Sequence, residues 1–417
     1  RSSVMSLVSP AEGILETHVT WDEVEANLQK TFQTTAKLGA NKGVVHIGEG
    51  NGFLSRIGLI NCDWEGVEAD EKLPVRFALK MASCLAMKTM EAEIPAETRQ
   101  LPDILQAVWN SLEAFTKENH NAEVKAYEFF GRFEQKVAVP RCFFTVPFSD
   151  ENQFAGSIAL EYFDNTSVSH IYDTLSVEQV RQIARELGKI QAQSVLHGVV
   201  EEKWMGERDV CTSSWNHFTQ ETIVQMFAQI KELDPSMTKC VDAVCELVPT
   251  YYGTNLLTSL PQQYGVPPVL VNGDLWSGHI NEHRTCIEWH KIVILQAVHH
   301  GTPVEDLLRI AFSALSSDDR RAHMTELLNV IYDSLEETLD GAIPAPYTRQ
   351  QMMDLYEIAI PHAAFLCSLL LLSLFKTYIL AADISEDERT ARTKVGIDKI
   401  RGVCEDIVSF HVKNEEK

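Results

Sequence analysis

The stretch Val269–His283, VLVNGDLWSGHINEH, holds a carboxylate in a setting suited to catalysis. Asp274 and the glycine before it follow a short apolar run, Val269–Val271, which is typical of a buried strand. An aspartate on a loop at the end of such a strand is well placed to act as a general base. We therefore predict a catalytic loop with Asp274 as its base. The alternative is an aspartate that only forms a turn after glycine.

A lysine inside an apolar segment is the second candidate. The residues Val75–Met81 alternate in the manner of a strand, which places Phe77, Leu79 and Met81 on one face. Lys80 then projects from the opposite face, in the middle of a strand. Either it binds an anionic group, or it lies on an exposed face of the sheet.

The elements that must position these residues change character along the chain. A capping box at Thr20 and Glu23 predicts that a helix opens the folded part. Strand patterns follow at residues 44–64, 75–81, 137–148 and 157–163, and a helical pattern covers residues 102–131. Beyond residue 166 the patterns are mostly helical, beginning with a second capping box at Ser176 and Gln179.

These patterns predict an α+β fold with two lobes. Residues 1–19 form an N-terminal tail, and residues 20–165 form a small lobe with an antiparallel sheet, which carries the lysine strand. Residues 166–417 form a larger, mostly helical lobe, in which the segment 269–306 holds the catalytic loop.

Composition excludes some classes of partner. The chain has 417 residues and a formal net charge of −23, so it lacks the basic surface that binding to nucleic acids or anionic membranes requires. Its nine cysteines are scattered and odd in number, which favours reduced thiols and a cytoplasmic location. The apolar segment Ala363–Phe375 is shorter than the roughly 20 residues that span a membrane, so we predict a buried helix.

Five stretches together carry a resemblance to a known family: NGFLSRIGLINCDW, FALKM, ENHNAEVKAYEFF, PVLVNGDLWSGHI and QAVHHGTPVEDLLRIAFSALSSDDRRAHMTELL. In order and spacing, residues 20–380 resemble the ecdysteroid-kinase-like (CHK kinase-like) family. This family belongs to the choline kinase and aminoglycoside phosphotransferase branch of the protein-kinase-like fold. The resemblance implies an ATP-dependent phosphotransferase that acts on a hydroxyl of a small molecule.

The resemblance assigns roles to residues of the small lobe. It implies that Lys80 reaches the α- and β-phosphates of ATP and that Glu123 holds Lys80 by an ion pair. The turn that ends at Ser55 would lay backbone N–H groups and a hydroxyl over the phosphates, or it is a plain hairpin turn. Glu161 and Phe163 would form the hinge that contacts adenine.

In the larger lobe, the resemblance implies that Asp274 accepts a proton from the acceptor hydroxyl, or orients it. Asp306 would brace the catalytic loop by accepting hydrogen bonds.

Three positions depart from the family pattern. Asn272 replaces a histidine and can still orient the loop through hydrogen bonds. His279 replaces a metal-binding asparagine, although Mg²⁺ prefers oxygen ligands, and Ile294 replaces the metal-binding aspartate. Either Glu288 supplies the missing carboxylate from a shifted position, or the segments 286–289 and 291–296 only form a tight pair of strands.

Two hypotheses of function therefore remain open. The first is an active kinase for a small hydroxylated molecule. The second is a catalytically dead pseudokinase that acts as a module binding a small molecule or a protein. A third, intermediate possibility is nucleotide binding without metal, in which Lys80 alone neutralises the phosphates.

Overall fold

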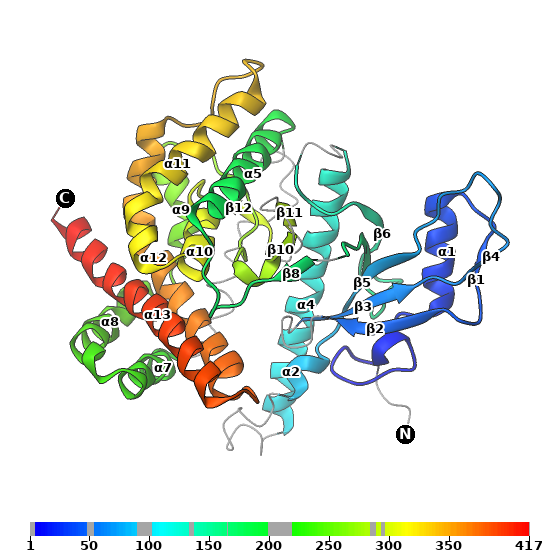
Figure 1. The fold of residues 1–417 in the computed structure, drawn as a ribbon, viewed down its shortest axis with the longest axis horizontal. Coiled ribbons are helices and arrows are strands. Elements are labelled where there is room, and N and C mark those ends of the chain that lie inside the picture. The colour runs from blue at the N-terminus through cyan, green and yellow to red at the C-terminus, as the bar shows by residue number, and fades with distance from the viewer. Residues whose placement is uncertain are drawn as a thin grey trace. The chain divides into compact units, whose positions relative to one another are not determined.

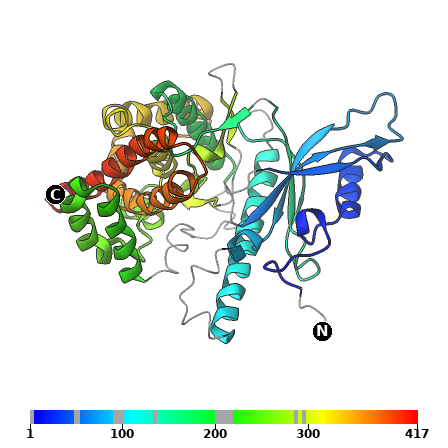
Figure 2. The same cartoon turned by 60° about the horizontal axis from the view of Figure 1, so that its bottom comes forward.

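The computed structural model describes residues 5–47, 54–89, 102–132, 137–164, 166–198, 219–283, 289–292 and 297–416. The chain divides into two compact units (Figures 1 and 2). The N-terminal unit comprises Arg1–Glu134 and Val139–Asp164, and the C-terminal unit comprises Gln135–Ala138 and Asn165–Lys417. The division after Asp164 lies beside the boundary predicted after residue 165.

The N-terminal unit is built on a five-stranded antiparallel sheet with the strand order β2-β3-β5-β7-β6. The central strand β5 alternates as predicted, because Phe77, Leu79 and Met81 are all fully buried in the core. A smaller antiparallel pair joins β1 (Lys37–Leu38) to β4 (Trp64–Glu65). The strands of the large sheet are β2 (Gly43–Ile47), β3 (Ser55–Asn61), β5 (Arg76–Ala82), β6 (Cys142–Val146) and β7 (Ser157–Glu161).

Helices of this unit pack on the sheet. Helix α1 (Trp21–Phe32) begins with the predicted capping box, in which the Thr20 side chain accepts from the Glu23 N–H. Helix α4 (Pro102–Gly131) coincides with the predicted helical segment and packs on β5 and β6 (Figure 1, cyan). The other helical pieces in the described part of this unit are the turn η1 (Ile14–Glu16) and the short helix α2 (Leu85–Thr89).

The predicted N-terminal tail is partly buried in the unit, beginning at Leu7, whereas Met5 is exposed. Leu7, Ile14 and Val19 are each no more than 3% exposed. The segment follows neither a helical nor a strand period apart from one short turn, so periodicity could not reveal that it is buried.

The C-terminal unit is mostly helical. Its longest helices are α5 (Val177–Leu196), which begins with the predicted capping box at Ser176, α11 (Ser317–Leu339), α12 (Arg349–Phe375) and α13 (Glu386–Glu415). Shorter helical elements are α7 (Gln220–Leu233), η3 (Pro235–Met237), α8 (Thr238–Tyr251), α9 (Leu256–Gln263), η4 (Ser277–His279), α10 (Glu305–Ala314) and η5 (Lys376–Leu380).

Two small sheets complete this unit. Strand β9 (Val269–Val271) pairs with β12 (His299–Gly301), and β10 (Ile280–His283) lies between β8 (Thr166–Val168) and β11 (Trp289–Ile292). An antiparallel sheet in one unit and a mostly helical second unit confirm the predicted two-lobed α+β fold class.

Helix α12 is the segment predicted to be buried, and it is longer than expected. It is long and apolar enough to span a membrane, together with η5. However, 83% of its most apolar window is buried inside the protein, as in the core helix of a folded domain. The predicted buried helix is therefore present.

A buried lysine ties the last helix to this unit. Lys399 of α13 is 1% exposed. Its ammonium donates to the backbone carbonyls of Ile171, Asp173 and Ser313 at 2.9, 2.5 and 2.7 Å. Three acceptors match the three N–H groups of an ammonium, although burial lowers the pKa of Lys399 to about 7.

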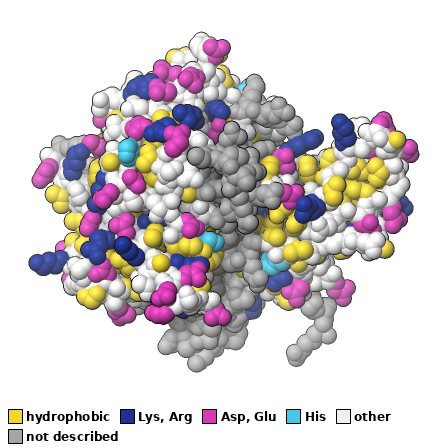
Figure 3. Space-filling model, in the orientation of Figure 1, with side chains coloured by type: hydrophobic (Ala, Val, Ile, Leu, Met, Phe, Trp, Pro, Cys, Tyr) yellow, Lys and Arg dark blue, Asp and Glu magenta, His cyan; other side chains and the backbone are white. Residues whose placement is uncertain are grey.

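The surface carries both signs of charge. Figure 3 shows acidic and basic side chains interspersed over the visible face of the described residues. On that face the acidic side chains are spread out, and Lys and Arg do not gather into one stripe.

Candidate active site

Lys80 and Glu123 form a buried ion pair within the N-terminal unit. Lys80 lies in the middle of β5, between Ile57 of β3 and Ile158 of β7. Its Nζ is 2.5 Å from Glu123 Oε2 on α4. The two residues are 5% and 1% exposed, so the predicted pair is present and the alternative of a solvated lysine is wrong.

Part of this cluster has unmet hydrogen-bonding capacity. Glu123 Oε1 and both amide atoms of Asn119 are buried and have no hydrogen-bond partner among the described residues. Asn119 precedes Glu123 by one helical turn, so the two side chains share a face of α4. Unpaired buried polar atoms cost about 1–3 kcal/mol each, so this face of α4 is a candidate place for a ligand or a water molecule.

The other residues predicted to contact the nucleotide lie at or just beyond the ends of strands in the same sheet. Ser55 is the buried first residue of β3 and pairs with Ala82, while the glycine turn before it lies outside the described residues. Glu161 ends β7, and its N–H donates to the Arg141 carbonyl at 2.8 Å. Phe163 follows this strand and is half-buried. Their contacts with a nucleotide remain predictions.

Asp274 lies on a tightly constrained loop in the C-terminal unit. The loop follows β9, as predicted. Gly273 has φ +74°, and a Cβ there would be 2.4 Å from the Ala297 carbonyl oxygen, so only glycine fits. The Asp274 N–H donates to Asn272 Oδ1 at 3.1 Å, which confirms the predicted role of Asn272 in orienting the loop. Asp274 itself is half-buried.

Asp306 of α10 braces this loop as predicted. Its two carboxylate oxygens accept from the N–H groups of Asn272 and Gly273 at 2.7 and 2.9 Å. Burial and the neighbouring Glu305 carboxylate raise the pKa of Asp306 to about 6, against the effect of these two donors. The brace fixes the backbone immediately before Asp274.

A second buried network lies under the loop, and sequence reasoning missed it. His299 Nε2 is 3.3 Å from one oxygen of Glu305, and Arg309 is 3.3 Å from the other. Burial alone would raise the pKa of Glu305, but the charges of His299 and Arg309 hold it below its ordinary value. The His299 ring also lies close to Gly273, since a Cβ added to that glycine would be 2.7 Å from the imidazole. All three residues lie in the stretch QAVHHGTPVEDLLR, where the family resemblance assigns a role to Asp306 alone.

A small cavity adjoins the aspartate. It is lined by Asp274, Leu275, Trp276, Arg309, Ser313, Cys367, Leu370 and Leu371. Its volume suits a single water molecule and is too small for an organic substrate.

The predicted metal ligands do not form a described site. His279 ends η4, and Glu288 and Ile294 lie outside the described residues. Within the described parts of the chain, no three His, Cys, Asp or Glu residues gather in a way that would hold a metal. The prediction of a tight strand pair within 286–296 is wrong for Trp289–Ile292, because these residues form one strand that pairs with β10.

Comparison with known proteins identifies the family. The DUF1679 family, described as "Uncharacterized oxidoreductase dhs-27", matches residues 7–415. The chain belongs to this family. Its description does not name the ecdysteroid-kinase-like family that the sequence resembles. No curated protein matches the sequence.

Solved structures similar to this member of DUF1679 include three phosphotransferases. A GDP and kanamycin complex of APH(2")-IIia has 11% identity and a TM-score of 0.43, covering 93% of this chain and 98% of that one. Ethanolamine kinase from Plasmodium vivax has 12% identity and a TM-score of 0.41, and the match covers 87% of this chain and 81% of the kinase. Macrolide 2'-phosphotransferase MphH from Brachybacterium faecium has 14% identity and a TM-score of 0.35, and the match covers 89% of this chain and 97% of MphH.

Proposed function

We propose that this protein binds ATP through Lys80 and Glu123 and transfers a phosphoryl group to a hydroxyl of a small molecule. The buried ion pair, 2.5 Å long in the middle of an antiparallel sheet, carries the proposal. Desolvation makes such a pair a poor means of stabilising a fold, so it favours a functional role. A lysine positioned by a carboxylate suits phosphate oxygens.

The chain's own residues divide the work. Lys80 orients the phosphates, and Glu123 holds the lysine in place. Asp274 accepts the proton of the acceptor hydroxyl, and Asp306 fixes the loop that presents it. When bound, Mg²⁺ would neutralise phosphate charge. We further propose an ecdysteroid-kinase-like specificity for small hydroxylated molecules and a cytoplasmic location.

A pseudokinase is the second candidate function. Ile294 stands where the family resemblance places a metal-binding aspartate, and it has no ligand atom. In that case the same fold would bind a nucleotide, a small molecule or a protein without catalysis. An oxidoreductase with a dinucleotide-binding sheet is disfavoured, because that sheet is parallel, whereas every strand pairing among the described residues is antiparallel.

Thermal unfolding with ATP tests the proposal. A ligand that binds the folded state at 100 times its Kd stabilises it by about 2.7 kcal/mol, so ATP should raise the Tm. Lys80→Met should abolish the shift, whereas Lys72→Met, which removes an exposed lysine of the same unit, should not. A shift of equal size in Lys80→Met would exclude the proposed site.

Adding Mg²⁺ and then an acceptor separates the candidates. A shift that requires Mg²⁺ indicates a metal site, and release of ADP in the presence of a hydroxylated acceptor indicates an active kinase. ATP binding without turnover across a panel of acceptors favours the pseudokinase.

A further inference from the structure

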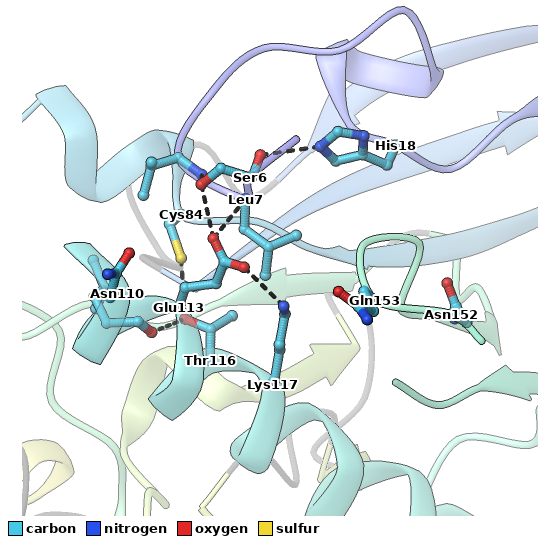
Figure 4. Close-up of polar contacts among 12 residues, drawn as sticks. Ser6, Leu7, His18, Cys84, Asn110, Glu113, Thr116, Lys117, Asn152 and Gln153 are labelled. Carbon is cyan, nitrogen blue, oxygen red and sulfur yellow. Dashed lines mark hydrogen bonds and ion pairs between the residues drawn. The ribbon is translucent and has the colours of Figure 1, made fainter. Parts of the chain in front are cut away.

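The N-terminal segment lies across two elements of the N-terminal unit (Figure 4). We name residues 5–13 the strap. Leu7 of the strap is buried in a small apolar cluster with Ala82, Cys84 and Phe148. This cluster is separate from the main core, and Val8, Leu112 and Phe154 pack at its edge. The strap is therefore part of the folded unit.

The polar contacts of the strap converge on one carboxylate of helix α4. The Ser6 hydroxyl and the Leu7 N–H donate to Glu113 Oε2 at 2.7 and 3.1 Å. Lys117 donates to the other oxygen, Oε1, at 2.7 Å. Although burial acts to raise the pKa of Glu113, these three donors hold it below its ordinary value. Figure 4 shows the strap and Lys117 on opposite sides of this carboxylate.

The strap also bonds to the end of the lysine strand. The Cys84 N–H, just beyond β5, donates to the Leu7 carbonyl at 2.9 Å. The Cys84 thiol in turn lies 3.2 Å from the Thr116 hydroxyl of α4. Two consecutive strap residues, Ser6 and Leu7, thus join the strand and the helix at one point.

These two elements are the ones that carry the buried ion pair. Lys80 lies four residues before Cys84, and Glu123 lies ten residues after Glu113 on the same helix. At 1.5 Å per residue, that separation is about 15 Å along a stiff helix. A tilt or slide of α4 at Glu113 would therefore be carried to Glu123, whose Oε2 lies 2.5 Å from Lys80 Nζ.

We propose that Glu113 is a positioning residue, which uses the strap to lock α4 against β5 so that Glu123 stays paired with Lys80. Its effect on ATP rests on the proposed function, whereas its effect on the ion pair does not. With Glu113 replaced by alanine, the strap loses two hydrogen bonds and Lys117 loses its partner. The paired state then becomes less populated, and ATP binding should weaken by on the order of tenfold.

Hydrogen–deuterium exchange of the full-length protein tests this directly. In Glu113→Ala, amides of residues 119–127 and 76–84 should exchange faster, while those of α11 in the other unit should not change. Glu113→Gln can still accept from Ser6 and Leu7, so it should restore most of the protection. Glu118→Ala, an exposed position on the same helix, is the matched control. Equal exchange around Glu123 in Glu113→Ala and Glu118→Ala would overturn the proposal.

ATP titration of the same variants separates the two proposals. Weaker binding in Glu113→Ala, restored by Glu113→Gln, supports both. If the wild-type protein binds no ATP, the proposed function fails, and the exchange at residues 119–127 still decides whether Glu113 positions the pair. Faster exchange with unchanged ATP affinity would overturn the link from the strap to nucleotide binding.

Discussion

Protonation of His120 should make the N-terminal unit sensitive to acid. His120 lies on α4 and is 4% exposed. Its Nε2 is 2.9 Å from the Val146 carbonyl, and its ring packs edge-on against Phe148 at 5.0 Å. Burial lowers the pKa of His120 to about 4, which outweighs the opposite effects of the Val146 carbonyl and Glu123. The folded unit therefore holds a neutral imidazole.

The magnitude follows from the two pKa values. An unfolded histidine has a pKa of about 6.5, so between about pH 6.5 and 4 the unfolded state binds a proton that the folded state does not. The stability that the neutral His120 contributes is fully present above about pH 6.5, and it is lost as the pH falls from there toward about 4. At 1.36 kcal/mol per pKa unit, the loss attributable to His120 is about 2.5 kcal/mol at pH 4.5.

Urea unfolding at pH 7.5 and pH 4.5 measures this loss. It should be followed through amide exchange in α4, because the two units need not unfold together. His120→Gln keeps a donor toward Val146 but cannot be protonated, so it should lose about 2.5 kcal/mol less than the wild type over this range. His46→Gln, on the exposed part of β2, should behave like the wild type. Equal losses in the wild type and His120→Gln would refute the neutral buried imidazole.

Two further predictions concern the C-terminal unit. Gly273→Ala places a Cβ 2.4 Å from the Ala297 carbonyl oxygen at a residue with positive φ. It should therefore lower the free energy of unfolding by well over the roughly 1 kcal/mol that a positive φ alone costs, and it should abolish activity. Gly341→Ala has a similar φ but nothing within 4 Å, so thermal unfolding should show only the φ cost. Lys399→Met should lower the unfolding free energy by about 3 kcal/mol or more, because buried carbonyls lose their donor. Lys394→Met, exposed on the same helix, should be neutral in urea unfolding, and equal effects would contradict the role of the carbonyl contacts.

Local signals in the sequence predicted much of the fold. The capping boxes at Thr20 and Ser176 are both formed, because each depends on residues only three positions apart. The helix at 102–131 and the alternation around Lys80 follow from periodicity, which is also a local property. The strand pairing of β10 was missed, since its partner β8 lies more than 100 residues away and leaves no local pattern.

The buried charges were predicted less completely, for a physical reason. Pattern-based prediction assigns charged residues to the surface, which is correct unless a partner compensates for burial. Lys80 and Glu123 were paired only through the family resemblance, whereas Glu305, Arg309 and His299 gave no such signal. Buried charged residues of this kind, which depart from the usual pattern of polar residues on the surface, are expected to cluster at functional sites.

The two groups of candidate residues are held by separate contacts, each within its own unit. The Lys80–Glu123 pair is held by elements of the N-terminal unit, and the Asp274 loop is held by Asp306 in the C-terminal unit. Ile294 stands where the family resemblance places a metal-binding aspartate, so we expect its substitution to act through metal binding. Ile294→Asp should therefore leave metal-free ATP binding unchanged. If it also brings phosphoryl transfer, the missing carboxylate was the only obstacle; if the variant binds Mg²⁺–ATP without transfer, a further element of the acceptor site is absent.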